Sequence, residues 1–193
     1  MKQIEYSKAR RMMLPGDLLA FGGSGYVSEI IKSSTDSNVS HVGVILQTSI
    51  PSLEGIFINQ IIESVGKKKA GEAGVVINRI SDHIRDYDGD IWWLPLLSKF
   101  RIRFNQGIFF SFMLDQIGKP YDLPQAIGSA LDFIPDNLED LDKLYCSELV
   151  SAGYEKIGFT EPINCSEQTP IDTCRFNFLD SPFQLKGELK ELY

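Results

Sequence analysis

Cys146 has the surroundings of a nucleophile. It lies in Tyr145-Cys146-Ser147-Glu148-Leu149-Val150, at the start of a segment with the apolar spacing of an amphipathic helix. A thiol in the first helical turn lies near unpaired N–H groups and the positive end of the helix dipole, which favour the thiolate. The same N–H groups can stabilise an oxyanion formed when sulfur attacks a carbonyl. The alternative is an ordinary core cysteine, because free cysteines are among the most buried residues.

His41 is the candidate general base. It begins the strand-like run Ser40-His41-Val42-Gly43-Val44-Ile45, and the chain has only two histidines. The other, His83, lies in a polar segment beside Asp82 and Arg85, so we expect it to be exposed. An imidazole that reaches a cysteine at a helix N-terminus can take and return the thiol proton. The alternative for His41 is a structural histidine within a strand.

A carboxylate is expected to orient His41. Segments 39–47 and 56–63 have strand patterns, and their short link favours an antiparallel return. The register that pairs residue 41 with residue 63 places Glu63 opposite His41, with Cβ atoms about 4.5–5.5 Å apart. Glu63 would then hold the tautomer that presents the other ring nitrogen to sulfur. Two alternatives stay open: Glu63 faces water at a strand end, or Asp17 orients the imidazole instead.

A sheet and a helix are needed to bring these side chains together. Apolar patterns predict strands over Leu18–Phe21, 39–47, 56–63, 75–80 and 90–97. Helices are predicted near Tyr26–Ile31, over 102–117, and over Leu144–Ile157 with Gly158 as the C′ residue. Residues 123–142 are expected to form a loop with one short helix. The tail 159–193 has little periodicity and is expected to wrap the surface.

Composition and charge exclude several classes of protein. The chain has 193 residues, 43% apolar and 23% charged, which suits one globular domain over 1–193 rather than a disordered chain or a rod. With 19 basic and 26 acidic residues the net charge is −7, so we expect no nucleic-acid partner. No apolar run reaches the roughly 18 residues of a transmembrane helix, and none is expected. The N-terminal segment lacks the apolar core of a signal peptide, which favours the cytoplasm and leaves export open.

The cysteines and histidines give no pattern typical of a disulfide framework or a metal site. Cys146, Cys165 and Cys174 are an odd number, which argues against a dedicated disulfide framework. The sequence contains neither Cys-x-x-Cys nor His-x-x-x-His, and its two histidines are far apart. We therefore predict no metal and no cofactor.

Five motifs, in order, resemble a known family of cysteine hydrolases. They are Gly16-Asp17-Leu18-Leu19, Ser40-His41-Val42-Gly43-Val44, Ile62-Glu63-Ser64, Gly118-Lys119-Pro120-Tyr121-Asp122 and Tyr145-Cys146-Ser147-Glu148-Leu149-Val150. This series resembles the circularly permuted NlpC-type papain-like cysteine hydrolases, the YiiX-like group, over about residues 14–158. Ordinary papain-like enzymes place the cysteine before the histidine, whereas here the histidine comes first, as in the permuted branch.

The resemblance implies a fold and a set of site residues. The fold would be α+β, with the cysteine helix packed on an antiparallel sheet or half-barrel in permuted order. Cys146 matches the family nucleophile, His41 the base and Glu63 the third polar residue. Tyr121 matches the tyrosine of the Gly-x-Pro-Tyr segment, where its hydroxyl could support the oxyanion or contact substrate; the alternative is a packed aromatic in a turn. Ser147 fits a hydrogen-bonding role in the first turn better than that of a second nucleophile.

The activity expected from these residues is hydrolysis of an amide bond through an acyl-thioester. The family includes peptidases and amidases that act on cell-wall peptides, so a small peptide is the expected substrate. Its relatives similar to lecithin:retinol acyltransferase handle acyl groups, and a lipid acyltransferase or thioesterase is therefore the first alternative. A binding module that retains the cleft without turnover is the second. No feature of the sequence indicates an oligomeric state.

Overall fold

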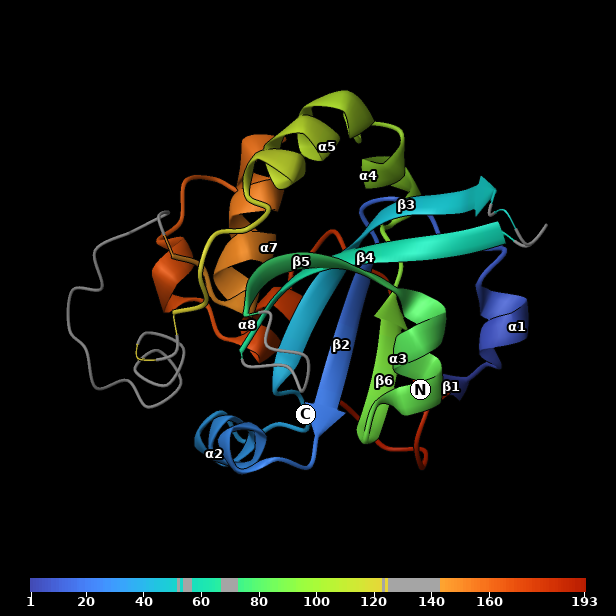
Figure 1. Ribbon diagram of the computed structural model, residues 1–193, viewed down its shortest axis with the longest axis vertical. Helices are drawn as coiled ribbons and strands as arrows, with labels where there is room; N and C mark the ends of the chain where they lie inside the picture. The colour runs from blue at the N-terminus through green and yellow to red at the C-terminus, as the bar shows by residue number, and fades with distance from the viewer. Residues whose placement is uncertain (52, 54–56, 67–72, 123, 125–142) are drawn as a thin grey trace.

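The strands of the protein form one mixed sheet, seen in the computed structural model in Figure 1. The structure describes residues 1–193 except 52, 54–56, 67–72, 123 and 125–142. The described strands are β1 (Lys2–Gln3), β2 (Leu18–Gly23), β3 (His41–Pro51), β4 (Phe57–Val65), β5 (Gly74–Arg79), β6 (Gly89–Leu94) and β7 (Phe183–Lys186). They lie in the order β1-β7-β6-β2-β3-β4-β5. Neighbours run antiparallel, apart from the parallel pair of β1 and β7.

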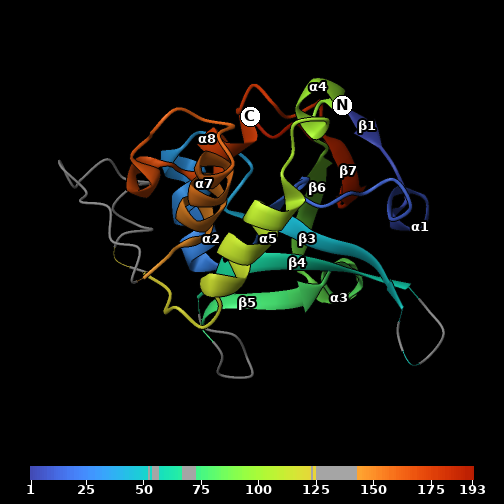
Figure 2. The same cartoon turned by 90° about the horizontal axis from the view of Figure 1, so that it is seen from above.

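Helices cover both faces of this sheet (Figures 1 and 2). The described helices are α1 (Tyr6–Ala9), α2 (Tyr26–Ser34), α3 (Ile80–Asp86), α4 (Ser98–Arg101), α5 (Gln106–Asp115), α7 (Cys146–Lys156), the 3₁₀ turn η1 (Cys165–Glu167) and α8 (Pro170–Cys174). Helix α7 packs on β3 and β4 and against α5. Helix α3 follows β5 directly and folds back on β4 and β5. None of the helices in the described part of the chain is long and apolar enough to cross a bilayer.

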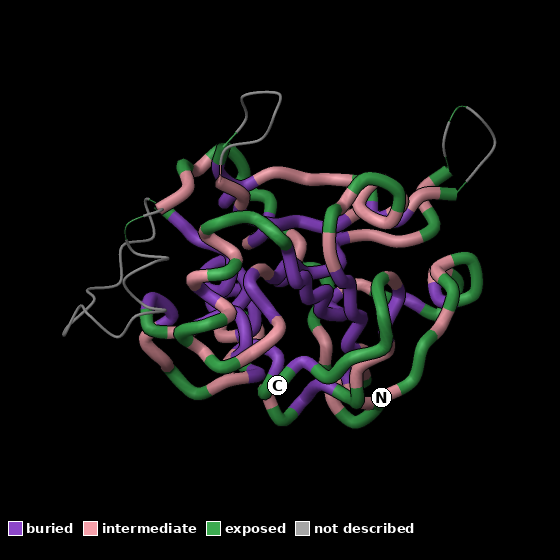
Figure 3. Tube along the Cα trace, turned by 90° about the horizontal axis from the view of Figure 1, so that it is seen from below, coloured by how far each residue is buried: buried purple, intermediate pink, exposed green. Residues whose placement is uncertain are grey.

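Period-two alternation divides the core into two clusters. Val44 belongs to the cluster that contains Leu149 of α7, whereas its neighbour Ile45 belongs to the cluster that contains Ile80 of α3. Successive strand residues point to opposite faces, so both clusters draw on the same strands. Figure 3 shows the buried segments running through the middle of the molecule and the exposed ones at its periphery. The sheet is therefore buried on both sides where β3 passes through it.

The architecture confirms the expected α+β class and corrects one of the expected regions. The predicted strands and the helices near 26 and 144 are present, and Gly158 ends α7 with a φ of 70°, as a C′ glycine does. The helix predicted over 102–117 is shorter, because α5 covers only Gln106–Asp115. The tail 159–193 does not simply wrap the surface. Its strand β7 lies between β1 and β6, and both Cys165 and Cys174 are buried. The predicted short helix in 123–142 falls in a segment that lies, except for Pro124, outside the described residues.

Candidate active site

Cys146 is the first residue of α7 and is almost completely buried, with 2% of its surface exposed. Burial alone would raise the pKa of the thiol, but the charge of His41 and a hydrogen bond with its ring hold it below the ordinary value. Backbone hydrogen bonds from Val42 and Ser147 act in the same direction. Hydrogen bonds to the charged form of a group favour that form. The surroundings of this sulfur therefore favour the thiolate.

The N-terminus of α7 is held in place from two sides. The Ser64 hydroxyl on β4 donates to the carbonyl of Leu144, two residues before the cysteine. On the other side, the Tyr145 hydroxyl donates to the Ser166 carbonyl at 2.5 Å. The Glu148 carboxylate accepts from the Tyr145 N–H at 3.4 Å and from the Ser166 hydroxyl, which gives one half of a capping box. Sheet and 3₁₀ turn together fix where the sulfur lies.

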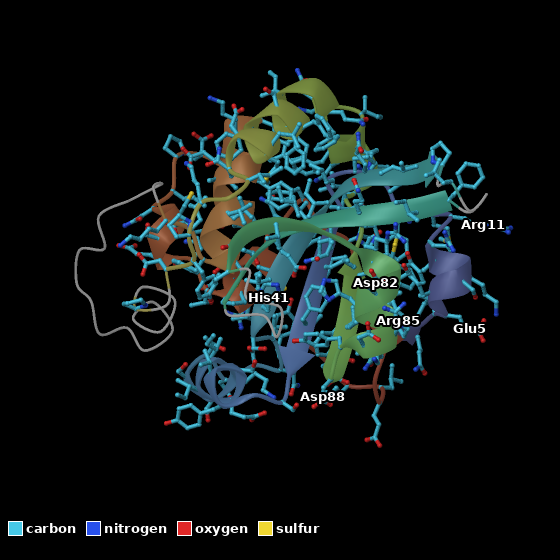
Figure 4. All side chains as sticks on the ribbon, in the orientation of Figure 1. Glu5, Arg11, His41, Asp82, Arg85 and Asp88 are labelled. Carbon is cyan, nitrogen blue, oxygen red and sulfur yellow. The ribbon has the colours of Figure 1, made fainter. Side chains whose placement is uncertain are left out.

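His41 is the first residue of β3, and the Cys146 sulfur contacts it beyond the point where β3 is paired with β4. Strand β3 pairs with β2 up to His41, whereas its pairing with β4 ends at Val44 and Ile62. The backbone N–H of Val42 therefore meets the Cys146 sulfur rather than a β4 carbonyl. Helix α7 packs on the face of Val44, and His41 belongs by alternation to the opposite face. Figure 4 labels His41 at the beginning of β3.

The imidazole of His41 lies between the sulfur and a carboxylate. Its Nε2 is 2.7 Å from Oε2 of Glu63, so Nδ1 is the nitrogen left to face Cys146. Burial would lower the pKa of His41, but the Cys146 sulfur and the Glu63 carboxylate raise it to about 10. Glu63 is 1% exposed, and although burial would raise its pKa, hydrogen bonds from His41 and His83 hold it well below its usual range. The three groups therefore favour a thiolate, an imidazolium and a carboxylate.

The strand register behind this contact differs from the expected one. Val44 pairs with Ile62 and Ile45 with Ile61, so Glu63 faces Gly43 rather than His41. A Cβ placed on Gly43 would lie 3.0 Å from the Cβ of Glu63. Because glycine leaves this space open, the carboxylate reaches diagonally to His41, a separation that long side chains can span. The expected contact is present, and the predicted direct pairing is wrong by two residues.

His83 is the second histidine of the site, and the expectation that it is exposed is wrong. Its Nε2 lies 2.6 Å from Oε1 of Glu63, and its side chain is 18% exposed, like that of His41. A signal for this was present in the sequence: His83 shares the i, i+3, i+4, i+7 spacing of Ile80, Ile84 and Tyr87, which marks the buried face of α3. The polar residues around it masked that pattern.

Asn78 on β5 is a further residue that the sequence did not reveal. Its Nδ2 donates to Oε1 of Glu63 at 2.6 Å. Glu63 pairs with Val76, so Asn78 is again a diagonal neighbour on the same face. The buried carboxylate therefore accepts three hydrogen bonds, one on Oε2 and two on Oε1.

Tyr121 lies close to the sulfur and is half-buried. Burial raises the pKa of its hydroxyl, and the charge of Cys146 raises it further, so the hydroxyl stays protonated. The segment that carries it is held by two backbone contacts: the N–H of Val75 donates to the Lys119 carbonyl at 2.9 Å, and that of Leu144 donates to the Pro120 carbonyl at 3.0 Å. Tyr121 is thus a neutral donor beside the N-terminus of α7.

Two other residues singled out in the sequence have different surroundings. Asp17 accepts hydrogen bonds from the Leu96 N–H at 3.0 Å, from Trp93 Nε1 at 3.0 Å and from Arg101. It therefore holds the core together and does not orient His41. The buried hydroxyl of Ser147 has no hydrogen-bond partner among the described residues, so the first-turn role expected for it is not seen there.

The described residues do not form a metal site. No group of three or more His, Cys, Asp or Glu side chains in this part of the chain is arranged to hold a metal ion. Glu63 and its two histidines lie close together without forming such a group. Their oxygen–nitrogen distances of 2.6 and 2.7 Å are those of direct hydrogen bonds, with the histidine nitrogens directed at the carboxylate itself.

Comparisons with known proteins find a similarity of fold and no similarity of sequence family. No family model matches the sequence, and no curated protein matches it. Among solved structures, the chain is similar to the crystal structure of the metalloprotein YiiX from Escherichia coli O157:H7, described as DUF1105. The TM-score is 0.51 at 20% identity, over 76% of this chain and 67% of that one. This likeness supports the YiiX-like part of the resemblance as a similarity of fold.

Proposed function

We propose that this protein is a cysteine hydrolase of the circularly permuted, NlpC-type papain-like kind that cleaves an amide bond. The observation that carries the proposal is the contact of Cys146 with His41, whose other ring nitrogen lies 2.7 Å from Glu63. A nucleophile, a base and an orienting acid in this order are the parts that covalent acyl transfer needs. The fold shared with YiiX and the order of the five motifs support the same assignment.

The chemistry proceeds in two steps. The Cys146 thiolate attacks the substrate carbonyl, and the resulting oxyanion is stabilised by N–H groups in the first turn of α7 and by the Tyr121 hydroxyl. The His41 imidazolium gives its proton to the leaving amine as the carbon–nitrogen bond breaks. His41 then takes a proton from water, whose oxygen attacks the acyl-thioester and releases the acid and the thiolate. Glu63 keeps the ring oriented and stabilises its positive charge throughout.

YiiX is described as a metalloprotein. The reaction proposed for this chain uses the side chains of Cys146, His41 and Glu63 instead. The donors that a metal would need are engaged here with one another: both Glu63 oxygens accept hydrogen bonds, and the sulfur accepts one from His41. No step of the proposed reaction is assigned to a metal.

A panel of substrates tests the proposal. We would incubate the protein with short peptide amides, cell-wall peptide fragments and long-chain acyl esters, quench in acid, and look by mass spectrometry for an acyl group on Cys146. Turnover of an amide, an acyl adduct on Cys146 and loss of both in Cys146→Ala are expected. Turnover of long-chain esters alone would favour the lipid enzyme instead. Binding without any adduct or turnover would favour the binding module and overturn the proposal.

A further inference from the structure

Glu63 is held on both of its oxygens, and one of the holding groups is a histidine outside the proposed triad. Oε2 faces His41 at 2.7 Å, whereas Oε1 accepts from His83 at 2.6 Å and from Asn78 at 2.6 Å. A carboxylate can rotate about its terminal torsion, which is broad and weakly restrained. Hydrogen bonds to both oxygens fix that rotation. The orientation of Oε2 toward His41 therefore depends on the hydrogen bonds that Oε1 accepts.

The ionisation of Glu63 depends on the same contacts. The side chain is 1% exposed, and a buried carboxylate is costly unless it is paired and hydrogen-bonded. Within the described part of the chain its ion-pair partners are His41 and His83, with no lysine or arginine among them. Hydrogen bonds from both rings lower the pKa of Glu63 against the effect of burial. His83 thus contributes to the negative charge that faces His41.

The two imidazoles are also placed by one shared side chain. The ring of Phe21 lies 5.3 Å from that of His41 and 5.1 Å from that of His83, measured between centroids. Phe21 is fully buried on β2 and pairs with His41 across the sheet. Helix α3, which carries His83, follows β5 directly. His83 is therefore placed by packing as well as by its hydrogen bond, as expected of a group that orients another.

We propose that His83 is a positioning residue for the sulfur–imidazole pair: it donates to Oε1 of Glu63 and so keeps Oε2 directed at His41. The inference rests on the proposed function in that it treats Cys146 as the nucleophile. It assigns His83 no contact with substrate. Without this donor, Oε1 keeps only Asn78 among the partners described above, and the carboxylate is free to turn away from His41. The imidazolium and the thiolate that it faces are then less favoured.

The test compares two replacements of His83. His83→Gln keeps an N–H donor that can reach Oε1, and His83→Phe keeps a ring that can pack on Phe21 but has no donor. Arg85→Gln is the matched control, because Arg85 lies exposed on the same helix and pairs with Asp82 and Asp86 rather than with Glu63. Thermal melting shows whether each variant is folded. Iodoacetamide alkylation of Cys146, followed by peptide mapping, reports thiolate formation without any substrate.

Alkylation is measured across pH, which requires the charges around His83 to be known. Among the described residues these charges include Glu63 across the hydrogen bond and Asp86 on the same helix, whereas Tyr87, whose ring lies 6.3 Å away, stays neutral because burial raises the pKa of its hydroxyl. A hydrogen bond to a charged group changes an equilibrium by about tenfold at the lower end of its usual range. We therefore expect His83→Phe to react about tenfold more slowly than the unmodified protein near pH 6, with its reactivity rising only at higher pH. His83→Gln and Arg85→Gln should follow the unmodified profile.

Each result decides the inference. A folded His83→Phe variant with an unchanged alkylation profile would show that His83 only fills space, and a Gln variant as slow as the Phe variant would show that donation to Oε1 is not what matters. Either overturns the proposal. Failure of the proposed function would look different: the unmodified protein would show no enhanced Cys146 reactivity, or enhanced reactivity without turnover of any substrate. In the second case the effect of His83 on the thiolate is still measured.

Discussion

Gly43 on β3 lies directly across from Glu63 on β4, and the missing side chain of Gly43 is what lets the carboxylate reach His41. A Cβ at Gly43 would lie 3.0 Å from that of Glu63 and 2.6 Å from Cδ1 of Ile61. The candidate site therefore needs a small residue next to its base as well as its three reactive side chains.

Gly43→Ala is expected to disturb both the sheet and the site. The added methyl group must displace Ile61 or Glu63, and overpacking of this kind costs about 1–3 kcal/mol of unfolding free energy. Urea denaturation measures that loss, and Cys146 alkylation near pH 6 should slow as Glu63 moves away from His41. The control is Gly107→Ala on α5, where a Cβ meets only Asn105 Oδ1 at 3.6 Å and helix propensity favours alanine. A Gly43→Ala protein as stable and as reactive as the unmodified one would contradict this account of the diagonal contact.

The rate of Cys146 alkylation should depend on pH through two titrations, that of the thiol at low pH and that of the His41 imidazolium at high pH. The pKa of the thiol is lowered by His41, so alkylation should already be fast near pH 6, below the usual thiol range. The pKa of His41 is raised to about 10, so the imidazolium should be lost only as pH rises through that value. Glu63→Gln removes the negative charge that stabilises the imidazolium. The pKa of the Cys146 thiol should therefore rise, and the pKa of His41 should fall. Cys174, whose pKa is raised by burial, provides an internal reference that should stay unreactive near pH 6. Equal rates for Cys146 and free cysteine would argue against an activated thiol.

Tyr121→Phe separates oxyanion stabilisation from thiolate formation. Removing one oxyanion donor typically lowers kcat about 100-fold or more. The thiolate is formed with His41, so alkylation of Cys146 should stay within about twofold of the unmodified rate. Tyr26→Phe is the control, because Tyr26 is 82% exposed on α2. If both kcat and alkylation fall together in Tyr121→Phe, the residue supports the packing around Cys146 rather than the oxyanion.

Asp17→Asn should affect stability and leave the site chemistry unchanged. Asp17 is 1% exposed and joins Trp93, Leu96 and Arg101. Loss of its charge beside Arg101 should lower the free energy of unfolding by about 2 kcal/mol. The pH profile of Cys146 should not move, because Glu63, and not Asp17, contacts His41. Asp115→Asn, on the exposed side of α5, serves as the comparison. A shifted profile in a folded Asp17→Asn protein would restore Asp17 as an orienting group.

Side-chain alternation made part of the site predictable. Alternation keeps His41 and Glu63 on one face for every register that is offset by an even number of residues, and a long carboxylate side chain tolerates an offset of two. Helix α7 was predictable for a similar reason, because the apolar stripe indicates the helix and Gly158 ends it, although it begins at Cys146 rather than at the expected Leu144. Patterns within one element thus predicted which residues could meet.

Relations between elements were not predictable in the same way. The contact of the Val42 N–H with the sulfur depends on where the pairing of β3 and β4 stops, which no local pattern of Val42 or Glu63 reveals. His83 was missed because its polar neighbours outweighed the spacing of Ile80 and Ile84. Strand β7, with four residues, is too short for alternation to distinguish it from a loop.

The two groups of β3 that meet the sulfur are consecutive along the chain. The ring belongs to His41 and the N–H to Val42, so one planar peptide unit joins them. Any movement of this part of β3 therefore shifts the backbone of His41 and the N–H of Val42 together. Covalent structure therefore fixes the Val42 N–H relative to the Cα of His41, while the Glu63 hydrogen bond and the Phe21 ring hold the imidazole itself.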